Sequence, residues 1–257
     1  MQPPPPIDDT VALFLDFDGT LAEIAPRPDA VRLAPDLVPL LGALHERLGG
    51  ALAVVSGRPL ADLDAFLAPL RLPAAAEHGA MLRSRAGAAP ARAAAGLGTA
   101  AELSPALDRV EDRARELAAR HPGLLVERKT ATVALHYRGA PELGARCVDT
   151  MRAAQGASPL LELLHGKCVV ELRPSGTCKG AAIGALMREP PFAGRMPVFA
   201  GDDVTDEAGF AKVRELGGIS IKVGPGETTA SHRCASPLAL RDWLRGVVDG
   251  GPARRRA

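Results

Sequence analysis

Two short apolar runs of this chain lead directly into clusters of aspartates, and this pairing constrains the fold more than any other feature. Residues 11–17 run into the motif D-F-D-G-T at 16–20, and residues 196–200 run into G-D-D-V-T-D at 201–206. Apolar runs of this length, ended by turn residues, predict buried strands. Because ligands in open α/β sheets bind beyond the carboxyl ends of the strands, we expect both clusters at one edge of a parallel sheet.

Apolar runs and amphipathic segments alternate along most of the chain. Further buried strands are predicted at 51–55, 74–77 and 219–223, and helices at 35–48, 59–67, 179–188, 205–216 and 237–248. Strands that alternate with helices in this way predict an α/β fold with a doubly wound parallel sheet, covered by helices on both faces.

The middle of the chain follows a different pattern. Helices are predicted at 105–119 and 141–154, and strands follow them in pairs, at 124–127 and 130–137 and at 160–164 and 168–172. Two helix-strand-strand units predict a small α+β domain with an antiparallel sheet. We therefore expect an inserted domain at 99–172, between core segments 1–98 and 173–257. The Ala-, Gly- and Pro-rich residues 87–98 predict a loop.

Composition narrows the class of protein. The 257 residues carry 31 Lys plus Arg against 30 Asp plus Glu, so no overall field favours a polyanion or an anionic membrane. Aromatic residues make up 3%, too few for the stacking platforms that bind single-stranded nucleic acid. The sequence shows no C-x-x-C pair, no signal peptide and no apolar run of the ~18 residues that span a membrane. We expect a cytoplasmic monomer that binds a small molecule and neither nucleic acid nor membrane.

The two acidic clusters indicate a metal site. The clusters at 16–18 and at 202–207 supply carboxylates and carbonyls at two strand ends. Oxygen-rich sites of this kind suit Mg²⁺, although Mn²⁺ and Co²⁺ accept similar sites. Asp203 has the alternative role of capping the helix that follows. We expect Asp203 and Asp206 to orient metal-bound water or a lysine rather than to bind the metal.

Two further features fit an anionic group. Ser56, Gly57 and Arg58 end a predicted strand and begin a helix, where N–H groups, a hydroxyl and a guanidinium can converge on a phosphate. Lys179 lies at the start of another predicted helix and adds a compact positive charge. Each feature alone has an ordinary explanation, as a serine helix cap or a surface lysine. Together with the acidic clusters they indicate phosphate chemistry.

The motifs occur in an order that resembles a known superfamily. D-x-D-G-T at 16–20, S-G-R at 56–58, an isolated lysine at 179 and G-D-D-x-x-D at 201–206 resemble the phosphatases of the haloacid-dehalogenase (HAD) superfamily. The insertion resembles the α+β cap of one HAD subclass, over a Rossmann-like core. Within the superfamily the chain is similar to the trehalose-6-phosphate phosphatases, through E-H-G at 77–79, E-R-K at 127–129, H-Y-R at 136–138 and V-E-L-R-P at 170–174.

The resemblance implies a mechanism and a set of roles. Asp16 would attack phosphorus and form an aspartyl-phosphate, because a carboxylate needs no separate base. Asp18 would protonate the leaving oxygen and later deprotonate water. Mg²⁺ would be held by Asp16, the Asp18 carbonyl and Asp202. The residues that would hold the transferring phosphoryl group are Gly19, Thr20, Ser56, Gly57, Arg58 and the catalytic Lys179.

Substrate choice would come from the inserted domain, because the core motifs contact only phosphate. The resemblance implies that Glu127, Lys129 and Glu171 bind sugar hydroxyls, and the alternative is that they are ordinary strand charges. We expect Mg²⁺-dependent hydrolysis of trehalose 6-phosphate to trehalose and phosphate. The sequence leaves open a HAD phosphatase for sucrose 6-phosphate or mannosyl-3-phosphoglycerate, a HAD phosphomutase, and a non-catalytic sugar-phosphate sensor.

Overall fold

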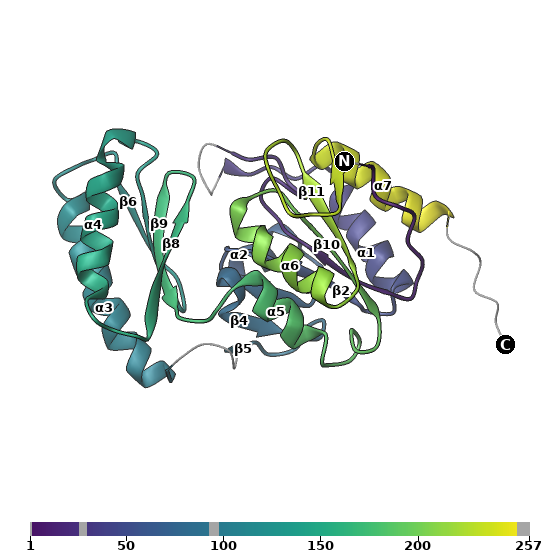
Figure 1. The fold of residues 1–257 in the computed structure, drawn as a ribbon, viewed down its shortest axis with the longest axis horizontal. Coiled ribbons are helices and arrows are strands. Elements are labelled where there is room, and N and C mark those ends of the chain that lie inside the picture. Colours follow the sequence, from purple (N-terminus) through teal and green to yellow (C-terminus); the bar gives the residue numbers. More distant parts are fainter. Residues whose placement is uncertain (1, 26–29, 93–97, 251–257) are drawn as a thin grey trace. The chain divides into compact units, whose positions relative to one another are not determined.

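The chain divides into two compact units, shown in Figure 1. The computed structural model describes residues 2–25, 30–92 and 98–250. The core unit comprises Met1–Ala91 and Cys178–Ala257, and the inserted unit comprises Arg92–Thr177. The inserted unit thus interrupts the core unit once.

The ends of the inserted unit differ from those expected at 98/99 and 172/173. The unit begins at Arg92 and ends at Thr177. The last strand of the inserted unit, β9 (Val169–Pro174), extends beyond residue 172, and Pro174 lies opposite Leu161 of the neighbouring strand. A boundary at 172/173 would therefore cut a paired strand.

The core unit is built on an eight-stranded sheet of order β12-β11-β10-β1-β2-β3-β4-β5. The strands are β1 (Val11–Leu15), β2 (Leu52–Val55), β3 (Ala74–Ala76), β4 (Met81–Arg83), β5 (Ala91–Arg92), β10 (Met196–Gly201), β11 (Ile219–Val223) and β12 (His232–Cys234). β1 pairs in parallel with β10 and β2, so that Leu15 lies beside Ala200 and Val54. The strands that lead into the two acidic clusters are therefore neighbours and run in the same direction.

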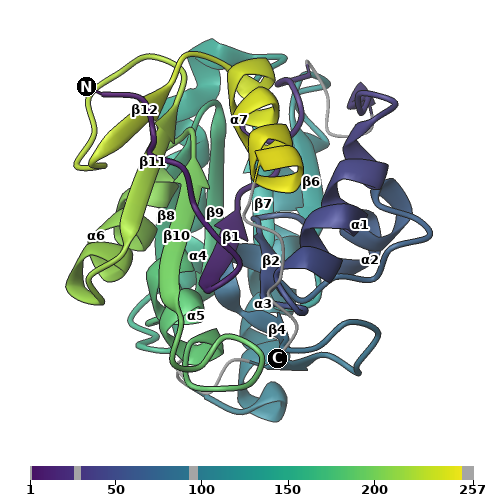
Figure 2. The same ribbon diagram turned by 90° about the vertical axis from the view of Figure 1, so that its right-hand side faces the viewer.

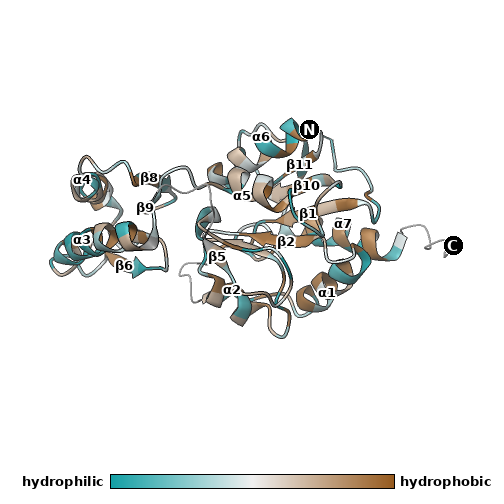
Figure 3. Cartoon of the chain, turned by 90° about the horizontal axis from the view of Figure 1, so that it is seen from below, coloured by the Kyte–Doolittle hydropathy of each residue, from teal (hydrophilic) through white to brown (hydrophobic). Residues whose placement is uncertain are grey.

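Helices cover both faces of the core sheet, as Figures 2 and 3 show. One face carries α5 (Lys179–Leu186) and α6 (Glu207–Glu215), and the other carries α1 (Leu37–Arg47), α2 (Leu60–Phe66) and α7 (Pro237–Gly250). Every residue of β1 and β2 is buried, as expected of central strands in a sheet covered on both sides. The doubly wound α/β core predicted from the sequence is confirmed.

Three short strands of the core sheet were not predicted. β4 runs antiparallel to β3 after a single tight turn, and β5 and β12 extend the two edges of the sheet. Each of these strands has only two or three residues, too few for a periodic signal. β5 falls within the loop expected at 87–98, of which residues 93–97 lie outside the described part of the chain.

The inserted unit packs two helices on a four-stranded antiparallel sheet of order β6-β7-β9-β8. Its elements are α3 (Ala100–Ala118), β6 (Leu125–Arg128), β7 (Val133–His136), α4 (Gly144–Gln155), β8 (Leu161–Gly166) and β9. Alternate residues of the central strands, among them Leu135 and Leu172, are buried in one apolar cluster with Leu107 of α3 and Met151 of α4. The α+β fold predicted for the insertion is confirmed.

Helix α3 begins five residues before the start that the sequence suggested, with Pro105 inside the helix. Thr99 and Glu102 form a capping box, in which each side chain accepts the backbone N–H of the other. This reciprocal cap satisfies two N–H groups of the first turn. Within the described ranges, no helix is both long and apolar enough to cross a membrane.

Candidate active site

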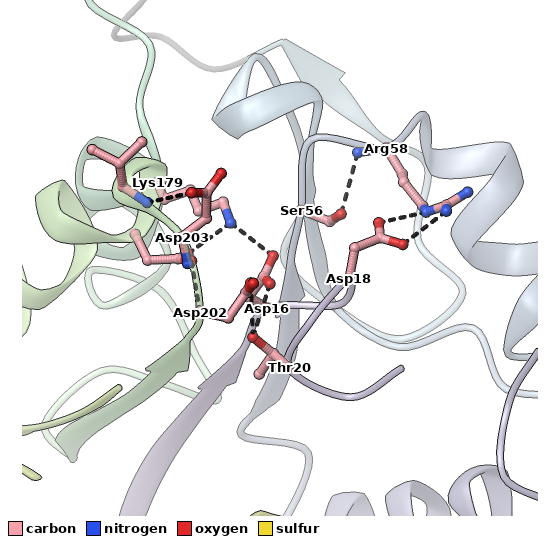
Figure 4. A network of polar contacts seen from close by, with 10 residues as sticks. Asp16, Asp18, Thr20, Ser56, Arg58, Lys179, Asp202 and Asp203 are labelled. Carbon is pink, nitrogen blue, oxygen red and sulfur yellow. Dashed lines mark hydrogen bonds and ion pairs between the residues drawn. The ribbon is translucent and has the colours of Figure 1, made fainter. Parts of the chain in front are cut away.

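Asp16 directly follows the buried strand β1, and its carboxylate is held from two sides. Its Oδ1 accepts a hydrogen bond from Lys179 Nζ at 2.7 Å, and its Oδ2 accepts one from Thr20 Oγ1 at 2.9 Å (Figure 4). The backbone N–H of Asp16 donates to Ala200 O of β10. All three polar side chains are buried. Both oxygens of the Asp16 carboxylate are therefore positioned by side chains of the core unit.

Asp206 organises the acidic loop that follows β10. Its Oδ1 accepts from Lys179 Nζ at 2.6 Å, and its Oδ2 accepts from the backbone N–H groups of Asp202 and Asp203 at 3.0 and 2.9 Å. The Asp203 side chain is exposed and accepts from Val204 N–H at 2.8 Å, which caps the turn that follows. Asp206 thus orients the lysine and the loop, and Asp203 has the capping geometry that the sequence offered as its alternative role.

Gly19 allows the two acidic clusters to approach each other. Its φ of +82° is one that glycine adopts without strain, and a Cβ at this position would overlap the carboxylate of Asp202. The Gly19 N–H donates to Ala22 O at 2.8 Å. Thr20 Oγ1 also lies 3.5 Å from Asp202 Oδ1. Gly19 and Thr20, expected to hold phosphate, here contact the acidic cluster and their own turn.

Burial and mutual repulsion oppose ionisation of these carboxylates. Burial raises the pKa of Asp16 well above its ordinary value; the Lys179 charge offsets this in part, and Asp206 and Asp202 add to it. Burial and the Asp206 carboxylate raise the pKa of Asp202 to about 6. Burial alone would lower the pKa of Lys179, but the carboxylates of Asp16 and Asp206 outweigh it and raise that pKa. The cluster carries more negative charge than one lysine compensates.

The donor set fits a divalent cation. Asp16, Asp202 and Asp206 each offer a carboxylate oxygen, and the three oxygens lie within 4.8 Å of one another. Carboxylate oxygens at this spacing suit Mg²⁺, and a cation would relieve the repulsion that raises the pKa values of Asp16 and Asp202. Asp206 already accepts three hydrogen bonds, two of them from the backbone of its own loop, whereas Asp16 accepts two. Asp16 and Asp202 are therefore the better candidates for ligands.

Lys222 is a contributor to the site that sequence reasoning missed. It lies on β11 beside Gly201 of β10, is almost fully buried, and donates from Nζ to the carbonyls of Asp202 and Val223. The lysine thereby fixes the peptide that carries the Asp202 side chain. A lysine within an apolar strand was the available signal, because buried lysines are rare unless their charge has partners.

Asp18 lies away from the Asp16 carboxylate and pairs with Arg58. The guanidinium donates from Nε to Asp18 Oδ2 at 2.6 Å and from the terminal nitrogen to Oδ1 at 2.8 Å, as Figure 4 shows. The Arg58 guanidinium also lies over the rings of Phe17 and Phe66, 5.6 and 4.9 Å from their centroids. A bidentate, stacked arginine is held more firmly than a single surface ion pair. Arg58, expected to support phosphate, thus contacts the proposed acid.

Ser56 and Gly57 lie in the loop between β2 and α2. The Ser56 hydroxyl is buried and accepts a hydrogen bond from Arg58 N–H at 3.2 Å. A Cβ on Gly57 would overlap the imidazole of His78. This loop follows β2, the strand next to β1 on the side opposite β10. The strand order therefore brings the S-G-R motif to the same edge of the sheet as Asp16.

The three residues expected to bind sugar share one face of the sheet in the inserted unit. Glu127 lies opposite Ala134, and Ala134 lies opposite Glu171, so both glutamates point to the face away from the helices. Lys129 Nζ donates to Glu171 Oε2 at 3.1 Å, and both side chains are buried. Glu127 Oε2 lies 2.8 Å from His136 Nε2. Burial raises the pKa of Glu127, but the His136 hydrogen bond and the Lys129 charge outweigh it, so that pKa is lowered.

The fold of the chain is shared with a solved protein. A solved protein from Bacteroides thetaiotaomicron, described among the phosphatases of the haloalkanoate (HAD) superfamily, matches with a TM-score of 0.60 at 12% identity. The match covers 93% of this chain and 94% of that one. The chain therefore has the HAD fold, with its α/β core, that the order of motifs predicted.

The family is defined more narrowly by sequence. Residues 14–242 match the family model of trehalose-phosphatase, and the chain belongs to that family of phosphoric monoester hydrolases. It is 42% identical over 245 residues to the trehalose-6-phosphate phosphatase of Escherichia coli strain K12, covering 95% of this chain and 89% of that protein. A solved trehalose-6-phosphate phosphatase related protein matches with a TM-score of 0.74 at 30% identity, over 92% of this chain and 96% of that one. The family resemblance seen in the sequence is confirmed.

Proposed function

We propose that this enzyme hydrolyses trehalose 6-phosphate to trehalose and phosphate, through an aspartyl-phosphate and with Mg²⁺. The observation that carries the proposal is the Asp16 carboxylate, held by Lys179 and Thr20 beside the acidic loop that contains Asp202. The similarity of the chain to enzymes named for this reaction supports the choice of substrate.

In the first step, a carboxylate oxygen of Asp16 forms a bond to phosphorus as the bond from phosphorus to the sugar oxygen breaks. The leaving alkoxide takes a proton from the carboxyl group of Asp18. Lys179 keeps the nucleophile aligned and, with the Ser56 hydroxyl, stabilises charge on the phosphoryl oxygens. Bound between Asp16, the Asp18 carbonyl and Asp202, Mg²⁺ would neutralise charge so that an anionic nucleophile can approach an anionic ester.

In the second step, a water oxygen attacks phosphorus, its proton passes to Asp18, and the bond between phosphorus and Asp16 breaks. This sequence returns both carboxyl groups to their starting states and releases inorganic phosphate. In the structure both carboxylate oxygens of Asp18 accept hydrogen bonds from Arg58. Protonation of the leaving oxygen in the first step then requires Asp18 to leave this pair.

Sugar recognition is assigned to Glu127, Lys129 and Glu171. Their support is the shared polar face of a sheet whose other face forms the apolar core of the inserted unit. Glutamate and lysine side chains fixed by neighbours can hydrogen-bond sugar hydroxyls with little loss of side-chain entropy. The ligand that we infer from this assignment is a small sugar phosphate.

The test is release of inorganic phosphate from trehalose 6-phosphate, sucrose 6-phosphate, mannosyl-3-phosphoglycerate and glucose 6-phosphate, each with Mg²⁺ and with EDTA. We expect rapid, Mg²⁺-dependent release from trehalose 6-phosphate alone, and a loss of ~10³-fold or more in Asp16→Asn. Preference for another ester would overturn the assignment of trehalose 6-phosphate as the substrate. Full activity of Asp16→Asn would overturn the assignment of Asp16 as the nucleophile. If the wild type released phosphate from none of the esters, the proposed phosphatase function would be overturned.

The sugar-binding assignment has a matched pair of variants. Glu171→Gln removes a charge that would bind sugar, and we expect kcat/KM for trehalose 6-phosphate to fall about 10- to 100-fold, with p-nitrophenyl phosphate affected less than about threefold. Glu162→Gln is the control, because Glu162 pairs with Arg173 on the same sheet at 2.8 Å and has no proposed contact with sugar. Equal losses on both esters in Glu171→Gln would contradict the assignment.

A further inference from the structure

The turn after β3 holds two adjacent residues in a backbone conformation that their side chains disfavour. Glu77 has φ of +50° and His78 has φ of +56°, both in the left-handed region. Non-glycine residues cost free energy there and persist only where the surroundings impose the conformation. Glycine adopts this conformation without the cost. Contacts made by Glu77 and His78 must therefore offset the conformational cost of the turn.

The S-G-R loop at 56–58 holds the turn in this conformation through backbone hydrogen bonds. Glu77 N–H donates to Arg58 O, and His78 N–H donates to Ser56 O, each at 3.0 Å. The two carbonyls lie on either side of Gly57. The left-handed turn is therefore joined to the loop by two backbone hydrogen bonds, and Glu77 is fully buried.

The His78 ring packs against the same loop. The imidazole lies against the Cα of Gly57, so closely that a Cβ on Gly57 would overlap it. On the other side of the turn, a Cβ on Gly79 would come within 2.8 Å of Cys178 O, the residue before Lys179. Residues 77–79 thus lie between the S-G-R loop and the start of α5.

We propose that Glu77–Gly79 is a strained positioning segment, and that the His78 ring fixes the Gly57 peptide and with it the phosphate-binding geometry of the S-G-R loop. The proposal rests on the proposed phosphatase function. Groups that bind a phosphoryl oxygen must be held within about 0.5 Å of their working positions. A turn that is hydrogen-bonded at both flanking carbonyls and packed against the intervening glycine supplies that restraint.

The experiment is a double-mutant cycle read by binding of inorganic phosphate to the Mg²⁺-loaded full chain, through calorimetry and competitive inhibition. His78→Gly keeps the left-handed turn and removes the ring, and we expect phosphate binding to weaken about tenfold. Gly57→Ala should weaken it by about 10- to 100-fold, because the new Cβ overlaps the ring. In the His78→Gly background, Gly57→Ala should cost less than threefold more.

The cycle distinguishes positioning from a general structural role. A structural role alone would lower the melting temperature and leave phosphate affinity unchanged in His78→Gly, which would overturn the proposal. Equal effects of Gly57→Ala in both backgrounds would also overturn it. Gly246→Ala, on α7 with open space around its Cβ, is the control and should leave phosphate affinity unchanged.

The outcome can be separated from that of the proposed function. If the wild type releases phosphate from trehalose 6-phosphate and His78→Gly binds phosphate as well as the wild type, only the positioning role fails. If the wild type hydrolyses none of the tested esters, the phosphatase function fails, whatever the cycle gives.

Discussion

Replacement of Asp202 by asparagine should stabilise the metal-free protein at neutral pH. The pKa of Asp202 is raised from an ordinary 3.8 to about 6 by burial and by the Asp206 carboxylate. At about 1.4 kcal/mol for each tenfold change in proton affinity, ionisation of Asp202 costs the folded state about 3 kcal/mol. Asparagine resembles the protonated acid and carries no such cost.

The pH dependence follows from the sign of the shift. Between pH 3.8 and about 6 the folded protein retains a proton that the unfolded chain has released, so stability falls as pH rises through this window. The unfolding free energy of Asp202→Asn should therefore exceed that of the wild type by about 1 kcal/mol at pH 4.5 and by about 3 kcal/mol at pH 7.5. For a domain of this size the latter difference raises the melting temperature by about 5 to 10 °C.

The assay is denaturant unfolding in EDTA at both pH values, repeated with saturating Mg²⁺. Only the wild type should gain stability from Mg²⁺, because the variant lacks a ligand, and the difference should shrink or reverse. Asp203→Asn is the control, since Asp203 is exposed and asparagine also caps. A variant no more stable than the wild type in EDTA at pH 7.5, or a difference independent of pH, would refute the reasoning.

Three further substitutions test other contacts. Gly19 has a φ of +82°, and a Cβ there would overlap the Asp202 carboxylate, so Gly19→Ala should lower the free energy of unfolding by about 1 to 2 kcal/mol and remove most of the stabilisation by Mg²⁺. An unchanged Mg²⁺ response in calorimetry would argue against that packing. Lys179→Met leaves two buried carboxylates without their cation and should lose about 3 to 5 kcal/mol at pH 7.5, with partial recovery at pH 5, checked by unfolding at both pH values. Arg83→Met breaks the bidentate pair with Asp64 and should lose about 3 kcal/mol in denaturant unfolding while kcat/KM stays within about twofold; a large drop in kcat/KM would contradict a purely structural role.

The sequence by itself determined which residues would meet at the carboxyl edge of the sheet. Asp16 and Asp202 each follow a run of buried strand residues, and parallel strands end at a common edge. The S-G-R loop reaches the same edge by the same rule, because it ends the next strand, β2. Strand ends could be located because apolar periodicity and turn residues are local properties of the chain.

Tertiary structure alone decided which partner each polar group takes. The pairing of Arg58 with Asp18 joins residues 40 positions apart, and the contact of Lys222 with the Asp202 carbonyl joins β11 to the residue that follows β10. No local pattern marks either contact. The left-handed turn at His78 is decided by the two carbonyls it binds, against the preference of the residue itself. Partner choice depends on distances between chain segments, which are fixed only when the sheet, its helices and the loops between them have packed.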